Sequence, residues 1–378
     1  MGLDTRVDEQ GHPLPPEMYD ALHAGDASIG GYNSNVLMLI HIPADGSKAT
    51  GISIPRDDYV DVTGVPGSGP FKAKIKEAYG YGFDAAKTSL INAGKADDDT
   101  TYQAARDAGR KAEIATVTQF LGNNVHIDHF LEVTMAAFYQ TAQAIAPITV
   151  CINKATQDTF SGADFKAGMQ QIDGKQAMAF VRQRRDTTDP NYQFSDLDRE
   201  RRQQAFIASV SHQLKQAGTF TDIGKMQGVL DAVSKNIVVD SELNLIELAQ
   251  QATSLTGGNI AFTTLPITGF GWSPEGASIN TVDIDQGPGH RQGTPHARAT
   301  NNTGRPHIGS KHRSRGPGQP GHGSRSPGAR SNTGSPGINP CGRKPCPGPN
   351  PHDEHLRGLD RCPSRRLHPL RQIRETRE

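Results

Sequence analysis

Short apolar runs along the first part of the chain have the length and spacing of strands. Residues 35–43 and 49–55 are apolar and rich in β-formers, and the turn-forming residues 44–48 separate them. This pattern predicts a hairpin in a buried sheet. Further strands are predicted over residues 148–152, 177–182 and 260–266.

Other segments repeat their apolar residues every three to four positions, which predicts helices. One helix begins near Ser195, because Asp198 three residues later completes a capping box. Helices and strands that alternate around one hairpin predict an α/β sandwich with a mixed sheet. The other predicted helices cover residues 101–121, 130–146, 226–233 and 243–255.

The last part of the chain has a different composition. Residues 286–378 carry 17 Lys and Arg against 5 Asp and Glu, whereas the first 285 residues carry 23 against 35. The tail has no Val, Met, Phe, Tyr or Trp, so burial cannot offset its chain entropy and we predict that it is disordered. The abrupt change favours a frameshifted tail over a genuine low-complexity one.

Arginines are concentrated between Gln176 and Gln204. On the predicted strand, Arg182 and Arg184 are two residues apart and share one face. Arg199, Arg202 and Gln203 have the spacing of one helix face. Planar guanidinium groups that converge in this way favour a site for a phosphate or diphosphate. The alternative is a set of surface ion pairs with the neighbouring acids Asp186, Asp189, Asp198 and Glu200.

An ordered set of short motifs extends from Met1 to Asp285. The motifs are Gly2-Leu-Asp4, Val36 to Ile42, Ser53 to Asp57, Lys74 to Gly82, Ile127 to His129, Ala179 to Arg184 and Asp196 to Gln204. In this order they resemble the LytR-CpsA-Psr family of bacterial cell-envelope proteins, and most closely its actinobacterial members. The resemblance implies a three-layer α/β/α sandwich outside the cytoplasmic membrane, anchored by one N-terminal transmembrane helix. The sequence shows no signal peptide or apolar run of spanning length, so we expect the anchor to be encoded upstream of Met1.

The same resemblance implies an enzyme. Family members bind a polyprenyl phosphate or diphosphate, use magnesium (or manganese), and transfer the attached glycopolymer onto peptidoglycan with release of polyprenyl phosphate. In the actinobacterial branch the polymer is arabinogalactan-like. Three alternatives stay open: a pyrophosphatase on the same lipid, a non-catalytic scaffold that binds the lipid phosphate, and a DNA-binding regulator. The acidic folded part without a helix-turn-helix pattern argues against a nucleic-acid partner.

Position by position, the resemblance assigns the phosphate-binding and catalytic roles to Arg56, Arg182, Arg184, Arg199 and Gln203, with Arg202 as a further phosphate contact. It assigns a metal-linked role to Asp4. Where the family has Arg-Ser-Asp, this chain has Asn33-Ser34-Asn35, so Asn35 is a weak, uncharged candidate ligand. Asp57 is interpreted as an ion-pair partner of Arg56, or as a group that orients the acceptor hydroxyl.

Overall fold

The hairpin predicted over residues 35–55 forms the centre of a mixed four-stranded sheet. The computed structural model describes residues 1–26, 28–44, 48–123, 125–189, 194–219, 222–234, 236–251 and 260–283. In it, β2 (Ser34–His41) pairs antiparallel with β3 (Ala49–Ile54). At the two edges, β1 (Gly2–Leu3) pairs antiparallel with β2, and β12 (Ile260–Thr264) pairs parallel with β3.

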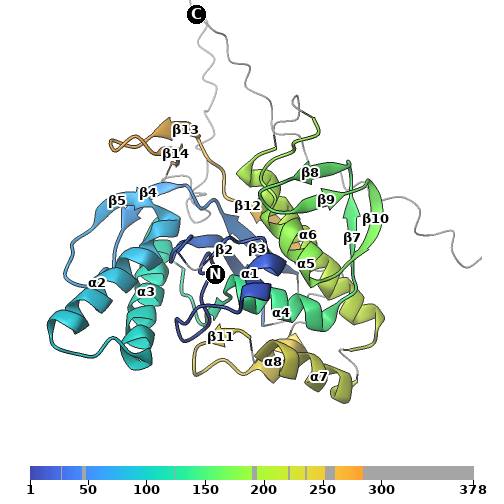
Figure 1. Ribbon diagram of the computed structural model, residues 1–378, viewed down its shortest axis with the longest axis horizontal. Helices are drawn as coiled ribbons and strands as arrows, with labels where there is room; N and C mark the ends of the chain where they lie inside the picture. Colours follow the sequence, from blue (N-terminus) through green and yellow to red (C-terminus); the bar gives the residue numbers. More distant parts are fainter. Residues whose placement is uncertain are drawn as a thin grey trace, which may run out of the picture. The chain divides into compact units, whose positions relative to one another are not determined.

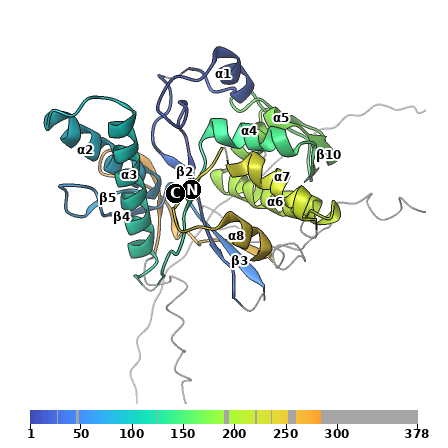
Figure 2. The ribbon, with the colours of Figure 1, turned by 90° about the horizontal axis from the view of Figure 1, so that it is seen from below.

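Helices cover both faces of this sheet. Figure 2 shows α2 (Ala78–Asn92) and α3 (Asp99–Phe120) on one side of β2 and β3, with α4 (Met135–Ile145), α5 (Gly174–Arg182) and α6 (Asp196–Gln216) on the other. Toward α3, Leu37 and Ile54 of the sheet form one buried cluster with Val117 and Leu121. Toward α6, the Gln204 amide donates to the Ser53 hydroxyl at 2.8 Å. The three-layer α/β/α sandwich is therefore confirmed.

Helix α3 is held to its neighbours by close backbone approach and by buried charges. A Cβ atom at Gly109 would lie 2.7 Å from the Tyr79 ring, so glycine lets α2 and α3 pack closely. On the same helix, Arg106 and Arg110 are both paired with the fully buried carboxylate of Glu132. Because a buried carboxylate is costly unless paired, these arginines fix the short strand β6 (Leu131–Glu132) against α3.

Smaller two-stranded sheets surround the central layer (Figure 1). The antiparallel pair β7 (Ile148–Ile152) and β10 (Gly168–Ile172) and the hairpin of β8 (Thr156–Asp158) and β9 (Ala163–Phe165) lie beside α5 and α6. The remaining elements are α1 (Pro16–Leu22), β4 (Tyr59–Val62), β5 (Phe71–Lys74), the 3-10 turn η1 (Ile75–Glu77), α7 (Ile223–Ser234), β11 (Val238–Val239), α8 (Leu245–Gln251), β13 (Gly269–Trp272) and β14 (Ser278–Thr281).

Two predictions about secondary structure were wrong. The segment predicted as a strand over residues 177–182 is the helix α5, because Asp173 and Gln176 form a capping box that starts a helix there. The helix predicted from Phe130 begins only at Met135, where Thr134 caps it by accepting from the Ala137 amide. The residues before Thr134 are extended and include β6.

The other predicted elements agree with the structure in type. The strands over 148–152 and 260–266 correspond to β7 and β12, and the helices over 101–121 and 226–233 to α3 and α7. The helix predicted over 243–255 is seen as α8 up to Gln251, and its last residues lie outside the described part. The domain boundary predicted after Asp285 and the disordered tail predicted over residues 286–378 also lie outside the described part. No helix within the described residues is long and apolar enough to cross a membrane.

Candidate functional site

A cavity of about 1000 Å³ lies between the strands β1 and β2 and the helices α4, α5 and α6. Most of its wall is apolar, and these residues include Val36, Met38, Ile40, Val125, Ile127, Phe138, Phe206, Ile207, Leu243 and Leu248. Its charged lining comprises six arginines and four acids, namely Arg6, Arg56, Arg182, Arg184, Arg185 and Arg199 with Asp4, Glu113, Asp128 and Asp158, and the amides of Asn35 and Gln203 also line it. The cavity is therefore amphipathic, with many positive charges and a large apolar volume.

The charged lining brings together arginines from distant parts of the sequence. Arg56 follows β3, Arg182 is the last residue of α5, Arg184 lies two residues beyond it, and Arg199 is in the first turns of α6. The strand face predicted to present Arg182 and Arg184 does not exist, but both side chains line the same cavity. The four predicted arginines other than Arg202 thus share one site.

The carboxylate of Asp196 holds three of these arginines together. Its oxygens lie 3.4 Å from Arg56 Nε, 3.1 Å from Arg184 Nε and 3.0 Å from an Nη atom of Arg199. The sequence motifs predict no separate role for Asp196, although its spacing of three residues from Arg199 is that of a helical ion pair. Asp196 therefore orients three guanidinium groups.

Asn35 fixes two of the same arginines from the sheet side. Its side-chain oxygen accepts a hydrogen bond from Arg56, and its backbone oxygen accepts one from Arg199 at 3.0 Å. Both arginine side chains are at most 7% exposed. Burial, reinforced by Arg56 and Arg184 and opposed by Asp196, lowers the pKa of Arg199 to about 10, so it remains charged at neutral pH.

A second group of charges stands beside Arg182. Its guanidinium donates to the backbone oxygen of Leu22, and burial lowers its pKa. Nearby, Arg6 donates to the backbone oxygen of Ala24 at 2.6 Å and lies 3.5 Å from the carboxylate of Asp4. These backbone contacts tie α1 to the end of α5 and hold both guanidinium groups at the cavity wall.

The remaining predicted residues have different surroundings. Gln203 lines the cavity, and its amide donates to the backbone oxygen of Val181 at 3.2 Å. The guanidinium of Arg202 is not part of the cavity lining and lies over the rings of Phe180, Phe194 and Phe165, at 5.0, 5.2 and 5.6 Å from their centroids. Its position favours a packing role over contact with a ligand.

Asp57 is engaged in ion pairs. Its carboxylate lies 2.8 Å from Lys76 Nζ, 3.7 Å from Lys74 Nζ and 3.5 Å from Arg56 Nε. Burial acts to raise the pKa of Asp57, but Arg56 and Lys76 outweigh it and the net pKa is lowered. The structure therefore supports the interpretation of Asp57 as a partner of Arg56.

Two buried carboxyl groups lie close to this site. Burial raises the pKa of Asp58 to about 8, against the effect of a hydrogen bond from Asn280. Burial, together with the negative charge of Asp196, raises the pKa of Glu200 to about 7. At neutral pH Asp58 is therefore largely protonated and Glu200 partly protonated, so these two groups contribute little negative charge beside the arginines.

The fit of a magnesium ion depends on Asp4. Within the described residues, no three His, Cys, Asp or Glu side chains are grouped so as to hold a metal ion. Magnesium in phosphate-transfer sites is commonly held by one or two carboxylates with substrate phosphates and water, so Asp4 in the cavity wall fits this pattern. The Asn35 side-chain oxygen already accepts from Arg56, and the Asn33 backbone oxygen accepts from the Asp4 amide at 3.0 Å.

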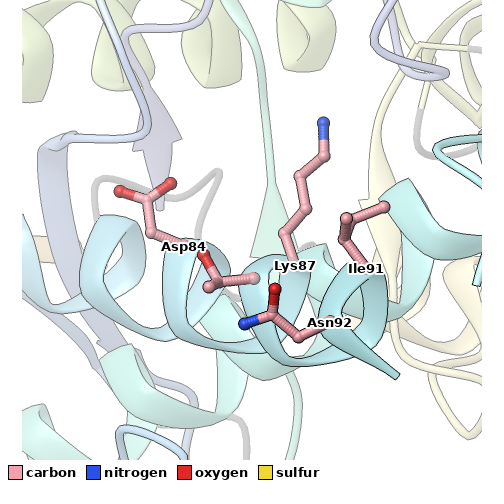
Figure 3. Close-up of a pocket in the computed structure, with 5 residues that line it drawn as sticks. Asp84, Lys87, Ile91 and Asn92 are labelled. Atoms are coloured by element: carbon pink, nitrogen blue, oxygen red, sulfur yellow. The ribbon is translucent and has the colours of Figure 1, made fainter. Parts of the chain in front are cut away.

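A smaller hollow of about 270 Å³ lies on the surface of α2 (Figure 3). It is lined by Asp84, Lys87, Thr88, Ile91 and Asn92, which all belong to this one helix. Because no other described element contributes a lining residue, side chains do not converge on this hollow from two sides. The amphipathic cavity is therefore the candidate functional site.

Comparison with known proteins shows the family to which the chain belongs. Residues 1–287 match the LytR_cpsA_psr family, and the chain belongs to it. The chain is 36% identical over 289 residues to the cell wall biosynthesis protein LcpA of Corynebacterium glutamicum, a match that covers 76% of this chain and 53% of LcpA. It is 29% identical over 246 residues to the polyisoprenyl-teichoic acid–peptidoglycan teichoic acid transferase TagU of Oceanobacillus iheyensis, which covers 65% of this chain and 64% of TagU.

The chain thus spans about half the length of LcpA and just under two thirds of TagU. Among solved structures, protein gbs0355 from Streptococcus agalactiae is similar, with a TM-score of 0.51 and 20% identity over 75% of this chain and 80% of that one. This likeness shows the fold, in agreement with the α/β/α sandwich described above.

Proposed function

We propose that this protein transfers a glycopolymer from a polyprenyl diphosphate carrier to a hydroxyl group of peptidoglycan, outside the cytoplasmic membrane. The observation that carries the proposal is the amphipathic cavity, whose apolar wall suits a polyprenyl chain and whose arginines suit a diphosphate. The names of LcpA and TagU, which refer to cell wall biosynthesis and to transfer onto peptidoglycan, support it.

In this reaction the acceptor oxygen bonds to the phosphorus that carries the polymer, the bond from that phosphorus to the bridging oxygen breaks, and the hydroxyl proton passes to the leaving phosphate or to water. Polyprenyl phosphate leaves, and a phosphodiester joins polymer and peptidoglycan. Phosphoryl transfer depends mainly on positioning and charge neutralisation. Arg56, Arg184 and Arg199, preorganised on Asp196, would stabilise the charge on the leaving phosphate. A magnesium or manganese ion held by Asp4 would supply further charge neutralisation.

We further propose that the polymer is arabinogalactan-like. The support is the resemblance of the sequence motifs to the actinobacterial members of the family, together with a lower identity to TagU, whose name specifies teichoic acid, at 29%, than to LcpA, at 36%.

A binding protein without transferase activity is the second candidate. The observation that favours it is that Asn33 and Asn35, which are uncharged, stand near Asp4 where the resemblance implies an arginine and an aspartate. Such a protein would retain the lipid phosphate and act as a scaffold in wall assembly. Hydrolysis of the same diphosphate, with water in place of the acceptor, is the corresponding side reaction.

The test is an assay of the purified protein with a glycosylated polyprenyl diphosphate and peptidoglycan fragments, with and without magnesium. We expect release of polyprenyl phosphate that depends on the acceptor. We also expect Arg184→Ala and Arg199→Ala each to abolish lipid retention. The matched control is Arg201→Ala, because Arg201 lies on the same helix, is 48% exposed and pairs with Asp198. Tight retention without turnover would favour the scaffold, whereas no lipid retention by the wild type would refute both candidates.

A further inference from the structure

An exposed aromatic ring stands at the charged part of the cavity. Phe160, in the loop between β8 and β9, is 65% exposed and lines the cavity together with Asp158 and Ser161. The guanidinium of Arg185 covers one face of the ring, 4.1 Å from its centroid. The ring is otherwise largely exposed, which leaves room for a ligand to contact it.

Hydrogen bonds hold this loop in a defined position. One oxygen of Asp158 accepts from the Phe160 amide at 3.0 Å, and the other accepts from the Ser161 hydroxyl at 3.0 Å and from the Arg184 amide at 3.3 Å. A ring nitrogen of His23 lies 2.9 Å from the backbone oxygen of Thr159. Phe160 is therefore presented by a preorganised loop, which reduces the entropy cost of binding a ligand there.

The same contacts place the ring next to the arginines that would hold the diphosphate. Arg184, whose amide bonds to Asp158, also pairs with Asp196 through its side chain. The apolar lining near Leu248 belongs to α8, and Figure 1 shows the β8–β9 hairpin and α8 at opposite ends of the folded part. A polyprenyl chain that extends toward α8 from a phosphate on the arginines would leave its attached group on the Phe160 side.

We propose that Phe160 and Arg185 form a subsite for the first sugar ring attached to the diphosphate. The C–H bonds of a sugar are slightly positive and stack against the negative face of an aromatic ring. Arg185 offers several N–H donors to the hydroxyl groups at the edge of the same sugar. This pairing of a flat apolar face with charged donors suits a sugar better than an isoprene unit. The inference rests on the proposed function and adds a residue that determines which donors are accepted.

The test compares two probes by equilibrium binding: a short-chain polyprenyl diphosphate that carries one N-acetylhexosamine, and the same lipid diphosphate without the sugar. Phe160→Leu should weaken binding of the sugar-bearing lipid by about tenfold, as expected for one lost ring contact, and should leave the bare lipid within about twofold. Phe160→Tyr should preserve both affinities. Phe270→Leu is the matched control, because Phe270 is 74% exposed on β13 and is not part of the cavity lining.

The outcomes separate the subsite from the proposed function. Equal weakening of both lipids by Phe160→Leu would assign the ring to the lipid or to the loop structure, and it would overturn the sugar subsite. Wild-type-like affinities for both probes in Phe160→Leu would overturn it as well. If the wild type itself binds neither probe, the proposed function fails, and this result is visible before any variant is measured.

Discussion

Replacing Asp196 by asparagine removes the charge that three arginines share. The substitution is nearly isosteric, so it tests charge more than shape. Arg56 and Arg199 are at most 7% exposed, whereas Arg184 is 42% exposed and is screened by solvent. In the folded protein without a ligand, the variant leaves two buried guanidinium groups with reduced compensation.

The magnitude follows from this burial. Removing one partner of a buried ion pair typically costs about 3–5 kcal/mol, and the exposed Arg184 adds less than about 1 kcal/mol. Because Asp196 is itself 22% exposed, we expect the lower limit, a loss of about 3 kcal/mol in the free energy of unfolding. For a domain of this size, such a loss lowers Tm by about 6–12 °C.

The assay is thermal unfolding with and without inorganic pyrophosphate, in the absence of divalent metal. An anion that binds the arginines replaces the lost carboxylate charge, so saturating pyrophosphate should raise the Tm of Asp196→Asn more than that of the wild type. Asp61→Asn is the control, since Asp61 pairs with Lys72 on the surface and both side chains are at least 40% exposed. The reasoning is refuted if Asp196→Asn unfolds like Asp61→Asn, or if pyrophosphate leaves the Tm difference from the wild type unchanged.

Three further predictions concern other parts of the site. Arg202→Ala should destabilise the fold by about 1–2 kcal/mol through lost aromatic contacts, while lipid retention stays within about twofold of the wild type. A large loss of lipid retention would show instead that Arg202 contacts the phosphate. Ile207→Trp, which places a bulky side chain in the apolar wall, should weaken polyprenyl diphosphate at least about tenfold but not inorganic pyrophosphate, in parallel binding measurements. Folded Asp58 keeps its proton up to pH of about 8 while unfolded Asp58 loses it near 3.8, so its stabilising contribution falls as pH rises between these values. Denaturant unfolding of Asp58→Asn should therefore show a smaller loss of stability across this window than the wild type, and an identical slope would contradict the assignment.

The sequence predicted those elements of the fold whose signals are local. The hairpin of β2 and β3 has two apolar runs around a polar turn, and α6 begins where Ser195 and Asp198 form their capping box. The signal for α5 is also local: the apolar content of residues 177–182 suits a strand, but the capping residues Asp173 and Gln176 just before them start a helix. Including these two residues would have predicted a helix.

The site depended on information that local patterns do not contain. Residue spacing alone placed Arg182 and Arg184 together through a strand that is absent, and the family resemblance is what brought Arg56 to the same site. Asn35 bonds to Arg199, which is 164 residues away in the sequence. Such a contact is decided by how β2 packs against the start of α6. Residue spacing also places Arg202 with Arg199 on one helix face, but the Arg202 side chain packs against the ring of Phe180.

The charge balance of the site explains how buried arginines are kept ready for an anion. The carboxylate of Asp196 is shared by three guanidinium groups, and burial keeps protons on Asp58 and, in part, on Glu200 near neutral pH. The Nε atoms of Arg56 and Arg199 are buried and make no hydrogen bond to any described residue. Guanidinium groups that lack a full complement of negative charge and of hydrogen-bond acceptors are costly to bury. A bound diphosphate offsets this cost, because it supplies both negative charge and acceptor oxygens. The free energy of binding is thereby concentrated on the phosphates, where charge changes during transfer, and the apolar wall only has to place the lipid.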